Sequence, residues 1–452
     1  MCGTRFRYGQ RAPAGPVVRR PEDLDDGGLR REEFHPVSGA RVVLADYDLL
    51  QSDFPQLRAA AVVEDHPEIA ALEGAARERA IREVLDGWLI RHAALVSRRQ
   101  AEQSVVNTPI SIGGATVSAC RPTRYGRALV IPVAARSNGS PPAAGAGADA
   151  GLLDVKGTGV GPNATPSFVN VHTNGLHFLG CAFLDLVSQW VIDEIFRVAA
   201  PRLFTVPTYA VLDAGFDIRW QTDPRLTTPA GIQVRRAHPR PPESYELPAL
   251  GSPLQREYFE IEMLIRHYGV TSTTPGTTLE LREVDGRLEV RYAGDLETHL
   301  DDQQLGRLSR LARMSGQPQR FEGINIQIAR RPAHDPHALQ LVDFGHFKYH
   351  RRFEHPVLSL VSDALMKWGG ATWPDDPAFV QPDPELCVPA PFLERRASWE
   401  EIEAGDCLPF PNGSELEVTS FALASRFRRG EIDGEQVRAR LASFVEQAAR
   451  RW

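Results

Sequence analysis

The chain has 452 residues, of which 42% are hydrophobic and 24% are charged, and its formal net charge at pH 7 is −7. This length suits two or three structural units, and this composition excludes a disordered or fibrous protein. The acidic balance argues against nucleic acid as a partner, although a local arginine cluster could still hold the phosphates of a small ligand.

The cysteine pattern and the lack of long apolar runs predict the cellular location of the protein. Five cysteines without a CxxC pair indicate neither a zinc site nor a disulfide framework. The first residues lack the apolar core of a secretion signal, and no apolar run approaches the length of a membrane span. We therefore expect a cytoplasmic protein without a membrane partner.

The first third of the chain predicts an irregular arm, a helical segment and a small sheet. Residues 1–55 are rich in Arg, Pro, Gly and Asp, with one short strand pattern at 40–44. Apolar residues recur at helical spacing between 67 and 99, which predicts one long helix or two. Runs of β-branched residues between 105 and 133 predict antiparallel strands, and the Gly/Ala/Pro/Ser stretch at 137–150 predicts a loop.

The later elements alternate between strands and helices before the chain becomes mainly helical. We expect strands at 151–156, 206–212 and 231–235, helices at 179–199 and 254–268, a hairpin of 278–282 with 288–292, and final helices at 415–428 and 434–450. The remainder is expected to be helical apart from the segment around Asp343. Strands first and helices later favour an α+β fold with two lobes.

Lys156 is the first candidate for chemistry. It ends a strand that is expected to be buried, and the glycine-rich turn Gly157-Thr158-Gly159 follows it directly. A buried lysine is costly unless its ammonium group meets an anion, and glycines let backbone N–H groups approach phosphate oxygens. The pattern predicts phosphate binding, whereas a lysine that reaches solvent from a strand end is the simpler alternative.

Asp343 is the second candidate, because it follows an apolar strand and precedes Phe344-Gly345. Asn325 lies in an earlier apolar strand pattern at 323–328. A Mg²⁺ ion on nucleotide phosphates takes hard oxygen ligands, usually a carboxylate helped by an amide oxygen. Asp343 and Asn325 are therefore predicted to hold the metal, although Asp-Phe-Gly is also a common turn signal.

The order of these features resembles that of the protein-kinase fold. In that fold a strand lysine pairs with an acid of the next helix and with phosphates, while an Asn and the Asp of Asp-Phe-Gly hold metal. The resemblance implies ATP and Mg²⁺ as cofactors. It also implies a kinase-like N-terminal lobe at 105–245 and a helical C-terminal lobe at 246–452, preceded by an extension with a long helix at 1–104.

A closer similarity is to the selenoprotein O family of kinase-like AMP-transferases. It rests on Val155-Lys156-Gly157-Thr158-Gly159, on Asn174-Gly175 before the helix, and on the strand from Val206 to Leu212. The similarity covers residues 150–215, with weaker correspondence as far as residue 350.

This resemblance implies a role for each matching residue. Lys156, with Gly157 and Gly159, would contact phosphate, and Lys156 would pair with an acid on the helix. Asp185 is better aligned for this pairing than Glu194. The two acids lie nine residues apart (194 − 185), about two and a half helical turns, so they point to opposite faces and only one can pair.

The resemblance also implies phosphate-binding arginines, for which Arg235, Arg236 and Arg240 are the candidates although their spacing differs. Such a cluster is equally compatible with a solvated surface.

The catalytic base departs from the family pattern. The family places an Asp directly before the metal-binding Asn, whereas this chain has Ile324 before Asn325. Glu322 or Asp335 could substitute, but the motif positions neither of them. Phosphoryl and nucleotidyl transfer depend mainly on positioning and charge stabilisation, so a missing base does not exclude turnover.

These observations predict a two-lobed, kinase-like α+β enzyme that transfers a nucleotidyl or phosphoryl group from Mg-ATP to a hydroxyl of a protein, peptide or small molecule. AMP transfer is slightly preferred, because the resemblance is to AMP-transferases. Two alternatives stay open. One is a catalytically reduced pseudokinase that binds nucleotide as a regulator or scaffold, and the other is an ATP-using enzyme that tailors a peptide.

Overall fold

The structure is a computed structural model of the chain. It describes residues 28–122, 128–133, 151–167, 174–199, 203–220, 225–239 and 412–449, four separate residues (Val18, Leu24, Ile261 and Ile265), and short segments between 270 and 396.

Contacts divide the chain into two compact units, and each is described by itself. Unit 1 comprises Met1–Val187, Val206–Pro239 and Glu394–Phe444, and unit 2 comprises Ser188–Thr205, Arg240–Leu393 and Val445–Trp452. This division differs from the expected boundaries after residues 104 and 245. The expected extension and part of the expected C-terminal lobe both belong to unit 1.

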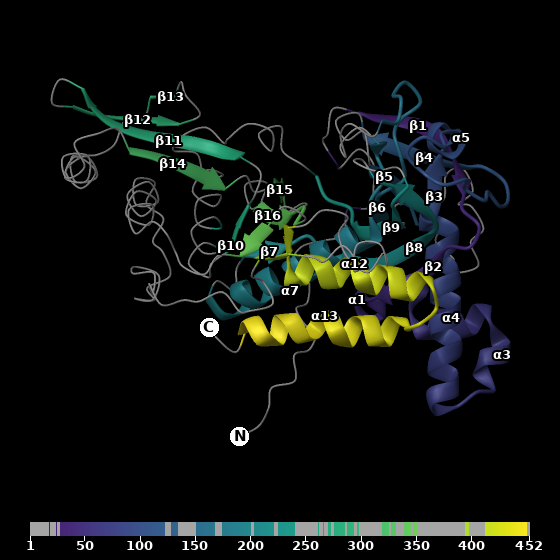
Figure 1. The fold of residues 1–452 in the computed structure, drawn as a ribbon. Coiled ribbons are helices and arrows are strands. Elements are labelled where there is room, and N and C mark those ends of the chain that lie inside the picture. Colours follow the sequence, from purple (N-terminus) through teal and green to yellow (C-terminus); the bar gives the residue numbers. More distant parts are fainter. Residues whose placement is uncertain are drawn as a thin grey trace. The chain divides into compact units, whose positions relative to one another are not determined.

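Unit 1 is built on an eight-stranded antiparallel sheet, which confirms a mixed α+β fold (Figure 1). Its strands follow the order β2-β8-β9-β6-β5-β4-β1-β3. They are β1 (Leu29–Pro36), β2 (Arg41–Ala45), β3 (Leu95–Ser97), β4 (Val117–Pro122), β5 (Ala128–Pro132), β6 (Leu152–Lys156), β8 (Thr208–Arg219) and β9 (Thr227–Arg236). The kinase-like arrangement of two lobes stays a prediction.

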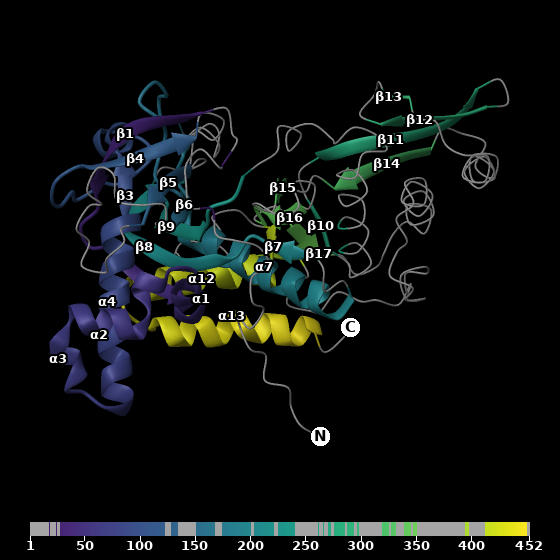
Figure 2. The ribbon, with the colours of Figure 1, turned by 180° about the vertical axis from the view of Figure 1, so that it is seen from behind.

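The helices come from both ends of the chain. The N-terminal set comprises α1 (Tyr47–Asp53), the short 3-10 helix η2 (Pro55–Leu57), α2 (Ala59–Asp65), α3 (Pro67–Ala70), α4 (Gly74–Ala93) and α5 (Arg98–Glu102). Helix α7 (Leu179–Ala199) follows β6, and α12 (Glu415–Arg428) and α13 (Gly434–Ala449) close the chain. Figures 1 and 2 show α12 and α13 side by side.

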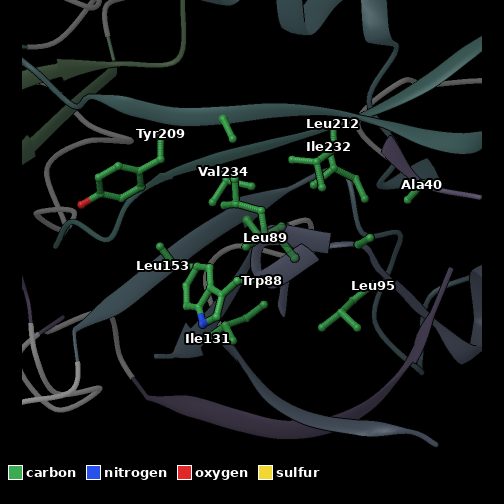
Figure 3. Close-up of a cluster of buried hydrophobic side chains, with 14 of the residues drawn as sticks. Ala40, Trp88, Leu89, Leu95, Ile131, Leu153, Tyr209, Leu212, Ile232 and Val234 are labelled. Carbon is green, nitrogen blue, oxygen red and sulfur yellow. The ribbon is translucent and has the colours of Figure 1, made fainter. Parts of the chain in front are cut away.

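The hydrophobic core of unit 1 lies between α4 and one face of the sheet (Figure 3). Leu85, Trp88 and Leu89 of α4 are fully buried, and their helical spacing places them on one stripe. The sheet contributes alternate residues, such as Leu153 on β6 and Val234 on β9. Because side chains alternate along a strand, the intervening residues of β6 and β9 face the opposite side of the sheet.

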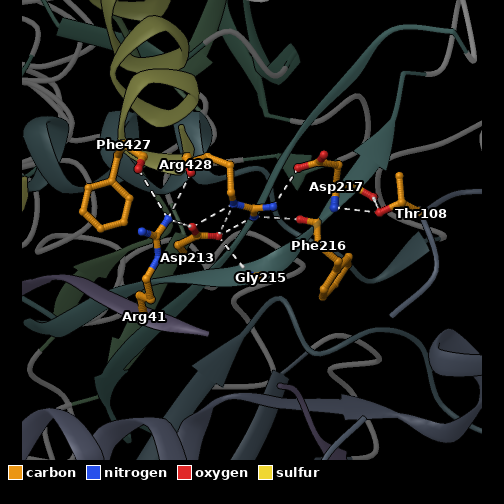
Figure 4. A network of polar contacts seen from close by, with 8 residues as sticks. All are labelled: Arg41, Thr108, Asp213, Gly215, Phe216, Asp217, Phe427 and Arg428. Carbon is orange, nitrogen blue, oxygen red and sulfur yellow. Dashed lines mark hydrogen bonds and ion pairs between the residues drawn. The ribbon is translucent and has the colours of Figure 1, made fainter. Parts of the chain in front are cut away.

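Helix α12 lies against that opposite side and is held there by a buried carboxylate (Figure 4). Asp213 on β8 is 0% exposed and accepts hydrogen bonds from Arg428 Nε at 2.8 and 2.9 Å. Arg41 of β2 donates to the same carboxylate at 3.0 Å, and Arg428 also reaches Asp217 at 2.9 Å. Two cations thus compensate the burial of Asp213 and join residues distant in sequence.

The start of α12 is fixed locally. The Ser414 hydroxyl accepts from the Glu417 backbone N–H at 3.1 Å, and the Glu417 carboxylate accepts from the Ser414 N–H at 2.6 Å. This capping box satisfies two backbone donors around the first turn of the helix. The helix was predicted at 415–428, and the structure confirms these bounds.

Unit 2 contains short strands in three separate sheets. The first sheet has the strand order β15-β16-β7. Its strands are β15 (Gln327–Arg330), β16 (Leu339–Val342) and β7 (Phe204–Thr205). The second sheet has the strand order β13-β12-β11-β14. Its strands are β13 (Leu296–Glu297), β12 (Arg287–Tyr292), β11 (Pro275–Val284) and β14 (Gln319–Ile324). Strands β10 (Val270–Ser272) and β17 (Phe347–Tyr349) form the third, while β18 (Glu394–Arg396) and β19 (Asn412–Ser414) pair within unit 1.

Several expected elements are confirmed, and others are wrong. The strands at 151–156 and 231–235, the helix at 179–199, the hairpin and both final helices are present. The helical segment ends at Ala93 and is followed by β3, not by further helix. The expectation of a helical remainder is wrong where β13, β14 and β17 form, because strands of two to six residues depend on distant pairing partners and carry little local signal. Strand β16 is the strand expected before Asp343, and β15 overlaps the strand pattern expected at 323–328.

The predicted helix at 254–268 lies outside the described residues, apart from Ile261 and Ile265. Among the described residues, no helix is both long enough and apolar enough to cross a membrane.

The Asp213 carboxylate generates a prediction about stability. Replacing Arg428 by Ala should lower the free energy of unfolding by about 2–3 kcal/mol, because Asp213 stays buried with Arg41 as its remaining arginine. Arg429→Ala is the matched control, since its ion pair with Glu431 is exposed and should be worth less than about 1 kcal/mol. Urea denaturation measures both changes, and equal losses would contradict the importance of Asp213.

Candidate functional site

Lys156 lies at the C-terminal end of β6, on the sheet face opposite the α4 core. Its antiparallel partner in β9 is Gln233, whereas the adjacent pair, Val155 and Val234, belongs to the core. The Lys156 side chain is 16% exposed. Such limited exposure makes a nearby anion necessary for the ammonium group.

Asp185 of α7 supplies that anion. Its Oδ2 atom lies 3.0 Å from Lys156 Nζ, and its side chain is 1% exposed. Helix α7 comes close to the sheet because position 231 of β9 is glycine: a Cβ there would lie 2.7 Å from Leu179 Cα. Glu194, the alternative acid, instead accepts from Arg197 Nε at 2.8 Å. Of the two predicted partners, Asp185 therefore contacts Lys156.

His177 is a third member of this group, and the sequence interpretation missed it. Its Nε2 atom lies 3.5 Å from the same Asp185 oxygen, and its side chain is 11% exposed. His177 precedes α7, so no helical periodicity connects it with Asp185. The backbone places His177 beside Asp185, because the His177 carbonyl accepts a hydrogen bond from the Gly231 N–H of β9 at 2.7 Å.

The glycine turn after Lys156 packs tightly against the segment that leads into α7. Gly157 and Gly159 have φ values of +101° and +87°, in the left-handed region that favours glycine. The Gly159 N–H donates to the Gly175 carbonyl at 3.0 Å, and Arg121 Nη1 donates to the Gly159 carbonyl at 3.1 Å. Gly159 is thus hydrogen-bonded within the protein, and contact of these glycines with phosphate stays a prediction.

Two of the three candidate arginines, Arg235 and Arg236, face opposite sides of the sheet. Arg235 faces the same side of the sheet as Lys156 and donates to Asp154 Oδ1 from Nε at 3.0 Å and from Nη2 at 2.8 Å. Arg236 follows it and points to the other face, where it pairs with Asp53 of α1. Arg236 therefore does not share a phosphate site with Lys156, and Arg240 lies outside the described residues.

Asp343 belongs to unit 2, where it follows β16 directly. It is the one residue other than glycine with positive φ, at 68°, among those that the structure describes. The β15–β16 register pairs Gln327 with Val342, the neighbour of Asp343. Asn325 lies outside the described residues, two positions before β15 begins.

Glu322, the candidate base, lies on β14 opposite Thr278 of β11, in a different sheet from β16. Asp335 lies outside the described residues. Within the described part of the chain, no group of three or more His, Cys, Asp or Glu side chains could hold a metal ion. Asp343 supplies a partly exposed carboxylate, the kind of oxygen that Mg²⁺ binds together with nucleotide phosphates.

The turn generates a prediction about glycine. In Gly159→Ala the new Cβ would lie 2.6 Å from Gln100 Cβ, in addition to the cost of positive φ. We expect a loss of about 3 kcal/mol in the free energy of unfolding. Gly430→Ala is the control, since Gly430 has φ +74° but no atom within 4 Å of the added Cβ, and should lose about 1 kcal/mol. Thermal and urea unfolding test this, and equal losses would contradict the packing role.

Comparison with known proteins assigns no family. No protein-family model matches the chain, and neither curated proteins nor solved structures gave a match.

Proposed function

We propose that the protein binds Mg-ATP and transfers a nucleotidyl or phosphoryl group to a hydroxyl of a protein, peptide or small molecule. The observation that carries this proposal is the ion pair between Lys156 at the end of β6 and Asp185 of α7. The other evidence concerns Asp343 and the resemblance of the sequence to kinase-like AMP-transferases.

The ion pair supports a role in binding because burying it costs free energy. Removing two charges from water is not fully repaid by their attraction, and apolar residues of similar size are often equally stabilising. Lys156 ends a strand whose other residues are buried, so an apolar residue would suit the packing. A lysine oriented by a carboxylate instead provides a fixed cation for a phosphate group.

Asp343 supports the metal part of the proposal. A non-glycine residue at φ 68° is uncommon, and backbone strain of this kind is concentrated at functional sites. The β15–β16 pairing also brings the strand that follows Asn325 beside the strand that precedes Asp343. In the proposed reaction these two residues hold Mg²⁺, which neutralises charge on the phosphates.

Each remaining residue has a proposed part. Asp185 orients Lys156, Arg235 lies on the Lys156 face as the nearest candidate for a further phosphate contact, and Glu322 is the candidate base. AMP transfer is slightly preferred over phosphate transfer, on the resemblance alone.

A pseudokinase that binds nucleotide without turnover is the second candidate, and one observation favours it. Ile324 stands before Asn325, where the resemblance would place an Asp. In that case nucleotide binding would serve a regulatory or scaffold function.

Incubation with Mg-ATP labelled at either the α or the γ phosphate distinguishes these functions. We expect label from α-labelled ATP on an acceptor or on the protein itself, and loss of this label in Lys156→Met. Label from γ alone indicates a kinase. ATP binding without label in either case indicates the pseudokinase, and absence of ATP binding contradicts the proposal.

Two further variants sharpen the same assay. Asp343→Asn removes the charge while keeping a residue that tolerates positive φ, so it should abolish Mg-dependent transfer without unfolding the protein. Arg98→Ala removes an exposed cation of unit 1 and should retain activity. Full activity of Asp343→Asn would remove Asp343 from the metal site.

A further inference from the structure

Asp185 has two basic neighbours on one oxygen. Its Oδ2 atom lies 3.0 Å from Lys156 Nζ and 3.5 Å from His177 Nε2. All three side chains are largely buried, with exposures of 1% for Asp185, 16% for Lys156 and 11% for His177. In such surroundings, charges interact more strongly than they do in water.

We propose that His177 is a positioning residue, which shares the Asp185 carboxylate with Lys156 and thereby sets how firmly Asp185 holds the lysine. When His177 is protonated, part of the Asp185 charge is compensated by the imidazolium. The Lys156 ammonium is then freer to face an anion. This inference rests on the proposed nucleotide-binding function.

The backbone holds His177 in this place independently of its charge. The His177 carbonyl accepts from Gly231, and a Cβ on Gly157 would lie 3.0 Å from His177 Cβ. The backbone of His177 is therefore held beside the glycine turn and β9, and its imidazole lies next to Asp185 of α7. A change in its protonation acts on the neighbouring charges without requiring a large movement.

The described elements also bring other ionisable groups near this cluster, among them the ion pair of Asp154 and Arg235 on the same face of the sheet. Cys181 lies one helical turn before Asp185, and burial, then the charge of Asp185, raises the pKa of its thiol to about 12, so it stays neutral. Glu417 of α12 adds a negative charge that acts on Cys181. Among these groups His177 is the histidine, the residue type whose unperturbed charge change lies between pH 5 and 8.

The test is the dissociation constant of Mg-ATP measured by calorimetry between pH 6.0 and 8.5, for the wild type and for His177→Gln. Glutamine keeps a polar group near the Nε2 position and stays neutral at every pH. ATP protonation affects both proteins equally, so it cancels in the ratio of their affinities. The ratio of wild-type to variant affinity should rise on the order of tenfold from pH 8.5 to pH 6.0.

His66→Gln is the matched control, because the His66 imidazole also lies beside a carboxylate, that of Glu68 at 3.2 Å. The ratio of wild-type to His66→Gln affinity for Mg-ATP should not change with pH. If both proteins bind Mg-ATP and the His177→Gln ratio is constant with pH, His177 is not a positioning residue, while the proposed function stands. If the wild type does not bind Mg-ATP at any pH, the proposed function fails and this inference fails with it.

Discussion

The buried carboxylate of Asp185 is the constraint on which the candidate site depends. A carboxylate that is 1% exposed must have cationic or donor partners, and Lys156 and His177 lie next to it. Bringing Asp185 to Lys156 requires α7 to approach β9 closely, which Gly231 permits. It also requires the chain to turn sharply after Lys156, which Gly157 and Gly159 permit through positive φ. Strand, turn and helix are thus fitted around one ion pair.

Asp213 plays a comparable part on the same side of the sheet. Its burial calls for the guanidinium groups of Arg41 and Arg428, which come from opposite ends of the chain. Unit 1 therefore contains residues from both ends, and its sheet cannot be assigned to one contiguous segment. The two carboxylates act in the same way: a charge that is costly to bury selects the segments that pack around it.

The elements that the sequence predicted well are those with strong local signals. Helices α7 and α12 have regular apolar spacing, and the α12 boundaries follow from a capping box. Strand β1 was missed because charged residues occupy half of it, and its formation depends on pairing with β3 and β4. Strands β10 and β17 of unit 2 were missed because three residues carry little local signal.

In the candidate site, too, local patterns predicted some features and missed those that depend on distant parts of the chain. Helical geometry showed only that Asp185 and Glu194 point to opposite faces, and the preference for Asp185 came from the resemblance. Arg236 was grouped with Arg235 on the resemblance, and the expected strand ended at 235. In the structure β9 continues to Arg236, so the two arginines face opposite sides. Strand alternation would have separated them had the strand been extended by one residue. His177 could not have been found, because its place depends on the backbone between β6 and α7.

The central claim is that Asp185 acts on bound nucleotide through Lys156. A double-mutant cycle measures this most directly, with Mg-ATP affinity determined calorimetrically for the wild type, Lys156→Met, Asp185→Asn and the double variant, each checked for folding by thermal unfolding. The account predicts that each single variant loses about tenfold or more in affinity and that the double variant loses little beyond Lys156→Met. Folded variants with unchanged affinity, or losses that add fully, would contradict it.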